Sequence, residues 1–429
     1  MSKKFKLILV LVTSACLIVL FVCFRNIHNR PNILLITIDA LRQDHLSCYG
    51  YKRNTSPNID NIAKEGVLFT QAISQACWTW PSMYSLATST YPSTHGVYFW
   101  DQFLQASIPT LPEILKRKGF YTGFISGHGG LAKFKRGFRT FEDVLGNPAQ
   151  EVTQKAIKWL QKNQGKTFFL WIHYMDAHDR SIGFPEDKHL VSTIAQEELN
   201  TYILRYDKAI SYVDSNIGFL LRKIKELGLY NKTMIIISAD HGEQLCEHGL
   251  CFVHGTFLWD SDIRIPLIIH YPNLLPQNKR VAQQVQQIDI LPTICDILEV
   301  KSPVTFEGIS LLSLIRDKKT SINFAFSEHK ESRDDLSTGP LILTRISVRS
   351  SEWKLIYSSW FGVKSHELYN IKADPEELNN LFGVETEQYK ILNAGLEAWL
   401  MRPRLKATPL KIVFDDKTHD NLKSLGYIR

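Results

Sequence analysis

Two stretches of the sequence place acidic and imidazole side chains where they could bind a metal ion together. Asp39 comes directly after the apolar run 32–38, and Asp240 and His241 follow the apolar run 234–238. Carboxylate oxygens and an imidazole can bind one metal ion together. Taken alone, Asp39 could equally be a helix N-cap. Two strands that both end in acidic residues are therefore stronger evidence for a metal site than either strand alone.

Thr79 stands where a helix is expected to begin. Pro81 follows two residues later and suits the first helical turn, where its missing N–H costs little. A hydroxyl at that point lies at the positive end of the helix dipole, where an anion would also bind. Taken alone, a plain threonine cap explains the same pattern.

Apolar runs that alternate with longer helical patterns predict the scaffold for these side chains. We expect buried strands at residues 32–38, 168–172, 234–238 and 266–269. Residues 202–227 are expected to form a helix that ends at Gly228. The alternation predicts an α/β fold with a mostly parallel sheet, in which chemistry gathers beyond the carboxyl ends of the strands. A hairpin pattern near 347–357 predicts a smaller antiparallel subdomain after about residue 301.

The composition is that of a globular protein. Of the 429 residues, 44% are hydrophobic and 22% are charged, which argues against disordered, collagenous and coiled-coil classes. The formal net charge is +7, without a long basic run. We therefore expect no nucleic-acid partner.

The N-terminus contains an uncharged apolar run over residues 7–24, with Lys6 before it and Arg25 after it. At about 1.5 Å per helical residue this run spans roughly 27 Å, enough for one membrane crossing. We expect a single-pass anchor within residues 1–30, with the catalytic domain extracytoplasmic because the preceding lysines favour a cytoplasmic N-terminus. A lipoprotein signal ending at Cys16 and a cleaved signal peptide are the alternatives.

The cysteines leave one disulfide question open. Cys246 and Cys251 are close enough in the sequence to bridge a short loop, and they could equally remain free thiols. A zinc site built on this pair is disfavoured, because no second pair with ligand spacing follows it.

Residues 31–429 resemble the sulfatase branch of the alkaline phosphatase superfamily. The matching segments, in chain order, are 32–39, 48–51, 55–60, 79–97, 240–243, 264–268, 289–293, 367–370, 374–375, 379–381 and 422–427. The resemblance implies an alkaline-phosphatase-like fold with a large mostly parallel sheet flanked by helices and a smaller C-terminal antiparallel subdomain. It divides the chain into an anchor over 1–30, a catalytic domain over 31–300, and a C-terminal subdomain with its tail over 301–429.

The resemblance also implies a metal centre. Asp39, Asp240 and His241 would be metal ligands, and Thr79 would occupy the nucleophile position and contact the metal. The implied cofactor is a divalent metal ion. Zinc or manganese suits these donors best, with calcium and magnesium as alternatives.

Two further histidines match segments of the family that contact the substrate. His178 resembles the histidine that binds the substrate anion, and His254 lies in the segment that supplies a lysine or histidine to the substrate oxygens. Each is therefore a candidate anion clamp or general acid for the leaving group.

The sequence departs from the sulfatase pattern at two places. Sulfatases carry Cys or Ser, any residue, Pro, Ser and Arg, and the Cys or Ser is oxidised to formylglycine; this chain has Thr79 and, four residues later, Met83. Threonine cannot become formylglycine by that route. Ala40 stands where sulfatases commonly place a second metal-binding aspartate.

A threonine nucleophile is similar to that of phosphodiesterases and of phosphoethanolamine or phosphoglycerol transferases in the same superfamily. We therefore expect a metal-dependent hydrolase that cleaves a phosphodiester or phosphomonoester through a metal-activated Thr79. The alternatives are a sulfuric ester hydrolase, a transferase of those types, and a non-catalytic surface protein that binds anionic glycans or lipids. The expected substrate is a phosphorylated or sulfated lipid, glycan or small molecule.

Overall fold

The computed structural model describes residues 30–146, 148–178, 183, 194–318, 324–335, 339–403 and 410–411. The apolar run 7–24 and the matching segment 422–427 lie outside the described residues. Within this described part, no helix combines the length and the apolar character that crossing a bilayer requires. The membrane anchor therefore stays a prediction.

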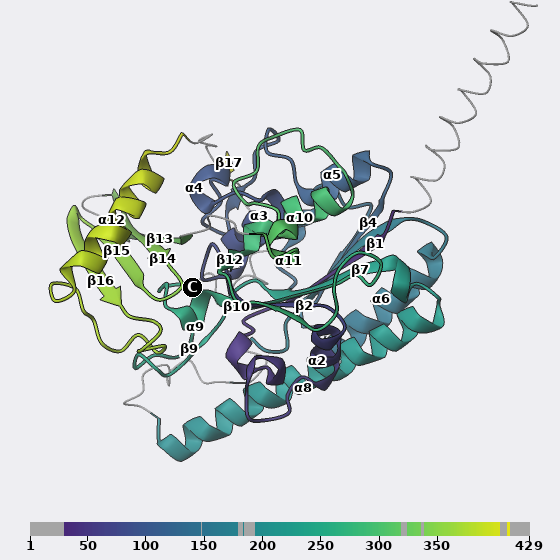
Figure 1. Cartoon of the computed structure of the whole chain (residues 1–429), viewed down its shortest axis with the longest axis horizontal. Helices are drawn as coiled ribbons and strands as arrows, with labels where there is room; N and C mark the ends of the chain where they lie inside the picture. Colours follow the sequence, from purple (N-terminus) through teal and green to yellow (C-terminus); the bar gives the residue numbers. More distant parts are fainter. Residues whose placement is uncertain are drawn as a thin grey trace, which may run out of the picture.

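A nine-stranded sheet forms the centre of the molecule (Figure 1). Its strands, in spatial order, are β11 (Lys279–Val281), β2 (Val67–Ile73), β10 (Arg264–His270), β7 (Thr233–Ala239), β1 (Asn32–Ile38), β6 (Phe168–Tyr174), β4 (Tyr121–Ser126) and β5 (Thr140–Asp143), with β12 (Val285–Gln286) paired to β2. The central β1 is parallel to both β6 and β7, and all of its residues are buried. This arrangement confirms the predicted mostly parallel sheet.

The strand β10 is an exception to that pattern, because it is antiparallel to both of its neighbours, β7 and β2. Between β7 and β10 the chain forms only the short hairpin of β8 (Gln244–Leu245) and β9 (Cys251–Val253) and the four-residue helix α9 (Asp260–Ile263). No long crossover helix returns the chain to the opposite edge of the sheet. The chain therefore enters β10 from the carboxyl edge and runs back through the sheet.

Helices cover both faces of the large sheet (Figure 1). One face carries α2 (Pro57–Lys64), α6 (Ala149–Asn163) and α8 (Gln196–Glu226), and the other carries α3 (Thr79–Thr88), α5 (Leu111–Arg117), α10 (Ile290–Ile297) and α11 (Leu312–Ile315). The predicted helix 202–227 corresponds to α8, which begins earlier than expected. Gly228 follows its end with φ +66°, a backbone conformation that suits glycine. The short elements α4 (Pro92–His95), β3 (Gln102–Phe103) and β17 (Leu410–Lys411) complete this part.

A second, four-stranded antiparallel sheet follows later in the chain. It is built from β13 (Ala325–Asp335), β14 (Gly339–Arg349), β15 (Lys354–Trp360) and β16 (Val363–Tyr369), and α12 (Thr386–Met401) packs against it. The predicted hairpin is the pair β14–β15, closed by a hydrogen bond of 2.8 Å from Ser350 N to Trp353 O. The smaller antiparallel sheet is thus confirmed.

A buried ionic cluster joins this second sheet to the segment before β10. Asp260 lies 2.8 Å from Arg349 Nη2 and 3.0 Å from Lys354 Nζ. Lys354 also lies 2.8 Å from Glu377, and none of the four side chains is more than 7% exposed. Burial opposes the charge on Asp260, but Arg349 and Lys354 hold its pKa well below the ordinary value. Each buried charge therefore depends on its partners.

Substitution of Asp260 tests this dependence. Asp260→Ala leaves two buried cations with less compensation, and we expect a loss of about 3–5 kcal/mol in the free energy of unfolding, measured by urea denaturation. Asp317→Ala is the matched control, because Asp317 is 83% exposed and pairs with Lys279 at the surface. Its expected cost is below about 1 kcal/mol. Equal urea midpoints for the two variants would contradict the assigned role of the cluster.

Candidate metal centre and active site

The predicted metal ligands come together at the carboxyl edge of the large sheet. Asp39 follows β1, and Asp240 and His241 follow β7, the parallel neighbour of β1. One ligand atom from each of these residues lies within 4.8 Å of the others, and all three residues are fully buried. The spacing of the ligands is therefore set by paired strands.

Each carboxylate uses one oxygen within the protein and leaves the other without a hydrogen-bond partner. Asp240 Oδ1 accepts from the N–H groups of Ala40 at 3.3 Å and His241 at 2.9 Å. Asp39 Oδ2 lies 3.3 Å from His173 Nε2. The buried Asp39 Oδ1 and Asp240 Oδ2 have no hydrogen-bond partner and lie 3.7 and 3.6 Å from His241 Nε2. Unpaired buried carboxylate oxygens beside an imidazole fit a divalent cation.

His241 presents an unprotonated nitrogen to this space when its ring is neutral. Its Nδ1 donates to Gly242 O at 2.7 Å, which leaves the lone pair on Nε2. Thr79 Oγ1 lies 3.3 Å from that nitrogen and 3.2 Å from Asp39 Oδ2. The structure thus brings the predicted nucleophile and the three predicted ligands together, and these residues fit the metal that the resemblance implies.

The pKa values of the two carboxyl groups also favour a bound cation. Burial opposes ionisation of Asp39, but the His173 hydrogen bond and the neighbouring His178 hold its pKa well below the ordinary value. Burial and the charge of Asp39 both raise the pKa of Asp240. A cation between the two carboxylates would relieve this repulsion.

Helix α3 begins at Thr79, as the sequence predicts, and all of its residues are buried. Trp78 precedes it in an extended conformation, so the helix starts abruptly at the site. Met83, which replaces the arginine of the sulfatase pattern, packs in the main apolar core. The start of α3 is consequently not fixed by a charge at position 83.

Two serines bind the backbone at the end of β7, where Asp240 lies, and the sequence alone did not identify them. Ser82 Oγ and Ser74 Oγ each lie 2.6 Å from the carbonyl oxygen of Asp240. Both serines are fully buried. Hydroxyl contacts with a backbone carbonyl leave no sequence motif, and the position of Ser82 three residues after Thr79 is the one signal that could have suggested its role.

The predicted substrate histidines lie beside the metal ligands. The ring centroids of His254 and His241 are 4.5 Å apart, and those of His254 and His178 are 5.0 Å apart. His254 Nδ1 lies 2.9 Å from Glu243 Oε2, and Glu243 is fully buried. Glu243 therefore orients the His254 ring beside the metal ligands.

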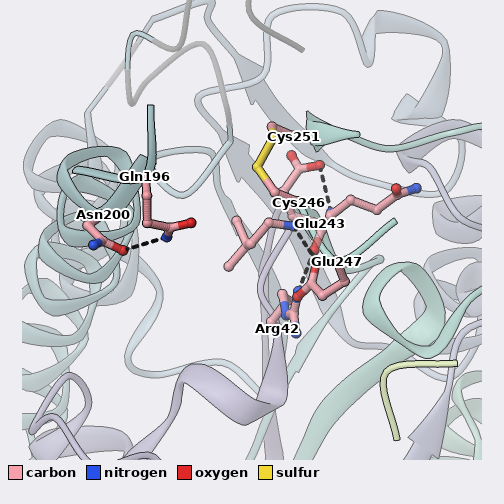
Figure 2. Close-up of a disulfide and its surroundings, with 9 residues drawn as sticks. Arg42, Gln196, Asn200, Glu243, Cys246, Glu247 and Cys251 are labelled. Atoms are coloured by element: carbon pink, nitrogen blue, oxygen red, sulfur yellow. Dashed lines mark hydrogen bonds and ion pairs between the residues drawn. A yellow bond between two sulfur atoms is a disulfide. The ribbon is translucent and has the colours of Figure 1, made fainter. Parts of the chain in front are cut away.

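A disulfide closes the hairpin that carries these groups (Figure 2). Cys246 and Cys251 are bridged, which settles the question that the sequence left open. The bridge joins the residue after β8 to the first residue of β9, with Glu243 just before β8 and His254 just after β9. It therefore fixes the two residues of the Glu243–His254 pair relative to each other.

Arg42 ties the same hairpin to the end of β1. Its Nη1 donates to the carbonyl oxygen of Glu243 at 3.1 Å and pairs with the carboxylate of Glu247, as Figure 2 shows. Arg42 also pairs with Asp44 at 2.7 Å. One buried guanidinium thereby connects the segments that supply Asp39 and Glu243.

The fold and this site define an ester hydrolase of the alkaline phosphatase superfamily. The sulfatase family model matches residues 31–300, and the model of the C-terminal region of N-sulphoglucosamine sulphohydrolase matches residues 246–406. The chain belongs to the sulfatase family.

Several relatives are similar over most of their length. N-acetylglucosamine-6-O-sulfatase of Bacteroides thetaiotaomicron is 22% identical, over 82% of this chain and 83% of the relative. A Delta 4,5-hexuronate-2-O-sulfatase of the same bacterium is 24% identical, over 91% and 93%.

Solved structures share the fold. A sulfatase-fold complex with its substrate D-glucosamine-2-N,6-O-disulfate has a TM-score of 0.71 at 23% identity, covering 86% of this chain and 97% of that chain. Phosphonate monoester hydrolase of Agrobacterium radiobacter has a TM-score of 0.72 at 20% identity, covering 86% and 95%. At these identities the likeness shows a common fold.

The metal centre can be tested by removing one ligand. We expect Asp240→Asn to weaken binding of Mn²⁺ or Zn²⁺ at least about 100-fold, because it removes a charge and one of the unpaired oxygens. After chelation, added metal should raise the melting temperature of the wild type and leave that of the variant unchanged. Asp44→Asn is the control, since Asp44 pairs with Arg42 and its side chain is 56% exposed. A wild type that binds none of Mn²⁺, Zn²⁺, Ca²⁺ and Mg²⁺ would rule out the centre.

Proposed function

We propose that this protein is a metal-dependent hydrolase that cleaves the sulfate ester of a glycan, with the Thr79 hydroxyl as nucleophile. The observation that carries the proposal is the position of Thr79 Oγ1, which lies 3.2 Å from Asp39 Oδ2 and 3.3 Å from His241 Nε2. A divalent cation held by Asp39, Asp240 and His241 would lower the pKa of the hydroxyl and neutralise charge on the ester oxygens.

Each residue of the site has a separate role in this reaction. The Thr79 hydroxyl gives its proton to water, and its Oγ1 forms a bond to sulfur while the bond from sulfur to the sugar oxygen breaks. The sugar leaves as an alcohol after receiving a proton from His254 or His178. Water subsequently cleaves the threonine ester and releases sulfate, which restores the hydroxyl. Glu243 supports the proton transfer because it holds the His254 ring at 2.9 Å.

The relatives support sulfate as the group that is cleaved. The names of three similar curated proteins describe sulfatases of N-acetylglucosamine, hexuronate and ulvan. The phosphoester substrate expected from Thr79 is not confirmed by these comparisons, and the alternative of sulfuric ester hydrolysis fits them better. The donor set favours zinc or manganese as the ion, with calcium and magnesium as alternatives.

A phosphate or phosphonate ester is the second candidate substrate. The observation that favours it is Thr79 itself, a plain hydroxyl where sulfatases carry a residue that is oxidised to formylglycine. Phosphonate monoester hydrolases from two bacteria share the fold of this chain. Attack of a metal-activated hydroxyl on phosphorus needs no modified side chain.

The extracytoplasmic placement of the catalytic domain is part of this proposal. It rests on the uncharged run 7–24 and on the disulfide between Cys246 and Cys251. Disulfides persist mainly in oxidising compartments, which supports a position outside the cytoplasm.

Turnover of nitrophenyl esters tests the function. The metal-loaded protein is expected to release nitrophenol from the sulfate ester faster than from the phosphate, phosphonate and phosphodiester analogues. Thr79→Val keeps the side-chain shape without the hydroxyl and should lower kcat by at least about 10³-fold, whereas Thr79→Ser should retain measurable turnover.

Thr88→Val is the matched control for this experiment, because Thr88 lies at the other end of α3 and its hydroxyl donates to Tyr84 O at 2.7 Å. Its kcat should equal that of the wild type. Turnover of phosphorus esters alone would replace sulfate by phosphate or phosphonate in the proposal. A protein that binds metal but cleaves none of the four esters would favour the non-catalytic binding role.

A further inference from the structure

Three buried side chains form a polar row that ends on the metal ligand Asp39. Trp171 Nε1 donates to Thr37 Oγ1 at 2.9 Å, and the same oxygen lies 2.9 Å from His173 Nδ1. His173 Nε2 lies 3.3 Å from Asp39 Oδ2. All four side chains are fully buried, and Thr37 and His173 face each other across the paired strands β1 and β6. The row is therefore part of the rigid centre of the sheet.

The proton on His173 Nε2 follows from the group that it faces. An ionised carboxylate can only accept, so a nitrogen at hydrogen-bond distance from Asp39 has to donate. A neutral ring with its proton on Nδ1 would instead turn a lone pair toward the carboxylate. Thr37 is compatible with this arrangement in either charge state of His173, because its hydroxyl accepts from Trp171 and can donate to Nδ1 of a neutral ring, or to the Ile172 carbonyl oxygen at 3.5 Å when Nδ1 carries a proton.

We propose that His173 is a positioning residue for the metal centre, whose Nε2–H holds Asp39 Oδ2 so that Oδ1 is directed at the metal. Asp39 Oδ1 is the oxygen without a hydrogen-bond partner, 3.7 Å from His241 Nε2. With a proton on Nε2, His173 is not itself a ligand. The inference rests on the proposed metal-dependent function.

His173 is also the donor to Asp39 that persists during the reaction. Thr79 is the second donor to Asp39 Oδ2, at 3.2 Å, but its hydroxyl proton is lost when the oxygen attacks the ester. At that step the N–H of His173 continues to fix the carboxylate. Hydrogen bonds to ligating carboxylates tune metal binding in this way, and their loss typically weakens affinity about 10–100-fold.

Metal affinity tests the role of His173. The dissociation constant for Mn²⁺ is measured by electron paramagnetic resonance on the full chain. His173→Leu, which has no donor, is expected to raise it about 10–100-fold. His173→Gln should recover most of the affinity, because the glutamine amide can donate to Asp39. His270→Gln is the matched control and should leave the constant unchanged.

His270 suits this control because it is a buried histidine of the same sheet, with its Nδ1 2.8 Å from Glu65 O. It lies opposite Ile235, near the start of β7, and so at the edge of the sheet away from the site. A change in Mn²⁺ affinity in His270→Gln would show that loss of any buried imidazole of the sheet disturbs the centre, and would overturn a specific role for His173.

A spectroscopic measurement on the wild type keeps the test independent of folding in the variants. In ¹⁵N-histidine-labelled protein loaded with Zn²⁺, the His173 signal, assigned from its absence in His173→Gln, should show a protonated Nε2. An unprotonated or metal-bound Nε2 would overturn the proposal. So would equal Mn²⁺ affinity in a folded His173→Leu variant. A wild type that binds no metal would instead contradict the proposed function, so the two failures are distinguishable.

Discussion

Two buried carboxylates at the ends of neighbouring parallel strands are the constraint on which the rest of the structure depends. Asp39 and Asp240 carry like charges, and both side chains are fully buried in the same site. Burial and Asp39 together raise the pKa of Asp240, so the pair is unfavourable without a positive charge between them. The sheet cannot relieve the repulsion, because the register of β1 and β7 fixes where the two strands end. The surroundings are therefore arranged to orient oxygens toward a cation.

This arrangement uses backbone and hydroxyl groups rather than further charges. Ala40 and His241 donate N–H groups to Asp240 Oδ1, and Ser74 and Ser82 bind its carbonyl oxygen. Such neutral contacts hold the ligand without changing the net charge of the site. They also connect it to α3, because Ser82 belongs to the helix that begins at Thr79. Nucleophile and ligand are thus positioned by one hydrogen-bonded unit.

The sequence predicted the features that depend on local pattern. The apolar runs that became β1 and β7 were visible because buried parallel strands are continuously apolar, and the acids that follow them marked the site. The direction of β10 was not predictable, since it depends on the absence of a crossover helix rather than on the residues of the strand. His173 was missed because it comes directly after the predicted strand 168–172, and in the observed strand β6 it is buried like a core residue. Its function depends on the pairing of β6 with β1, which no local pattern reports.

The two departures from the sulfatase pattern act in opposite directions on the charge of the site. Met83 replaces a residue that is commonly arginine, and Ala40 replaces one that is commonly aspartate, so one positive and one negative group are lost together. Met83 packs in the apolar core, and Ala40 still contributes its backbone N–H to Asp240. In a site that had lost its function, we would expect ligands to be replaced or exposed. Here the three ligands and Thr79 remain fully buried and close to one another. The two replacements together leave the formal charge unchanged relative to the sulfatase pattern, which is compatible with the unmodified Thr79 hydroxyl that we propose as the nucleophile.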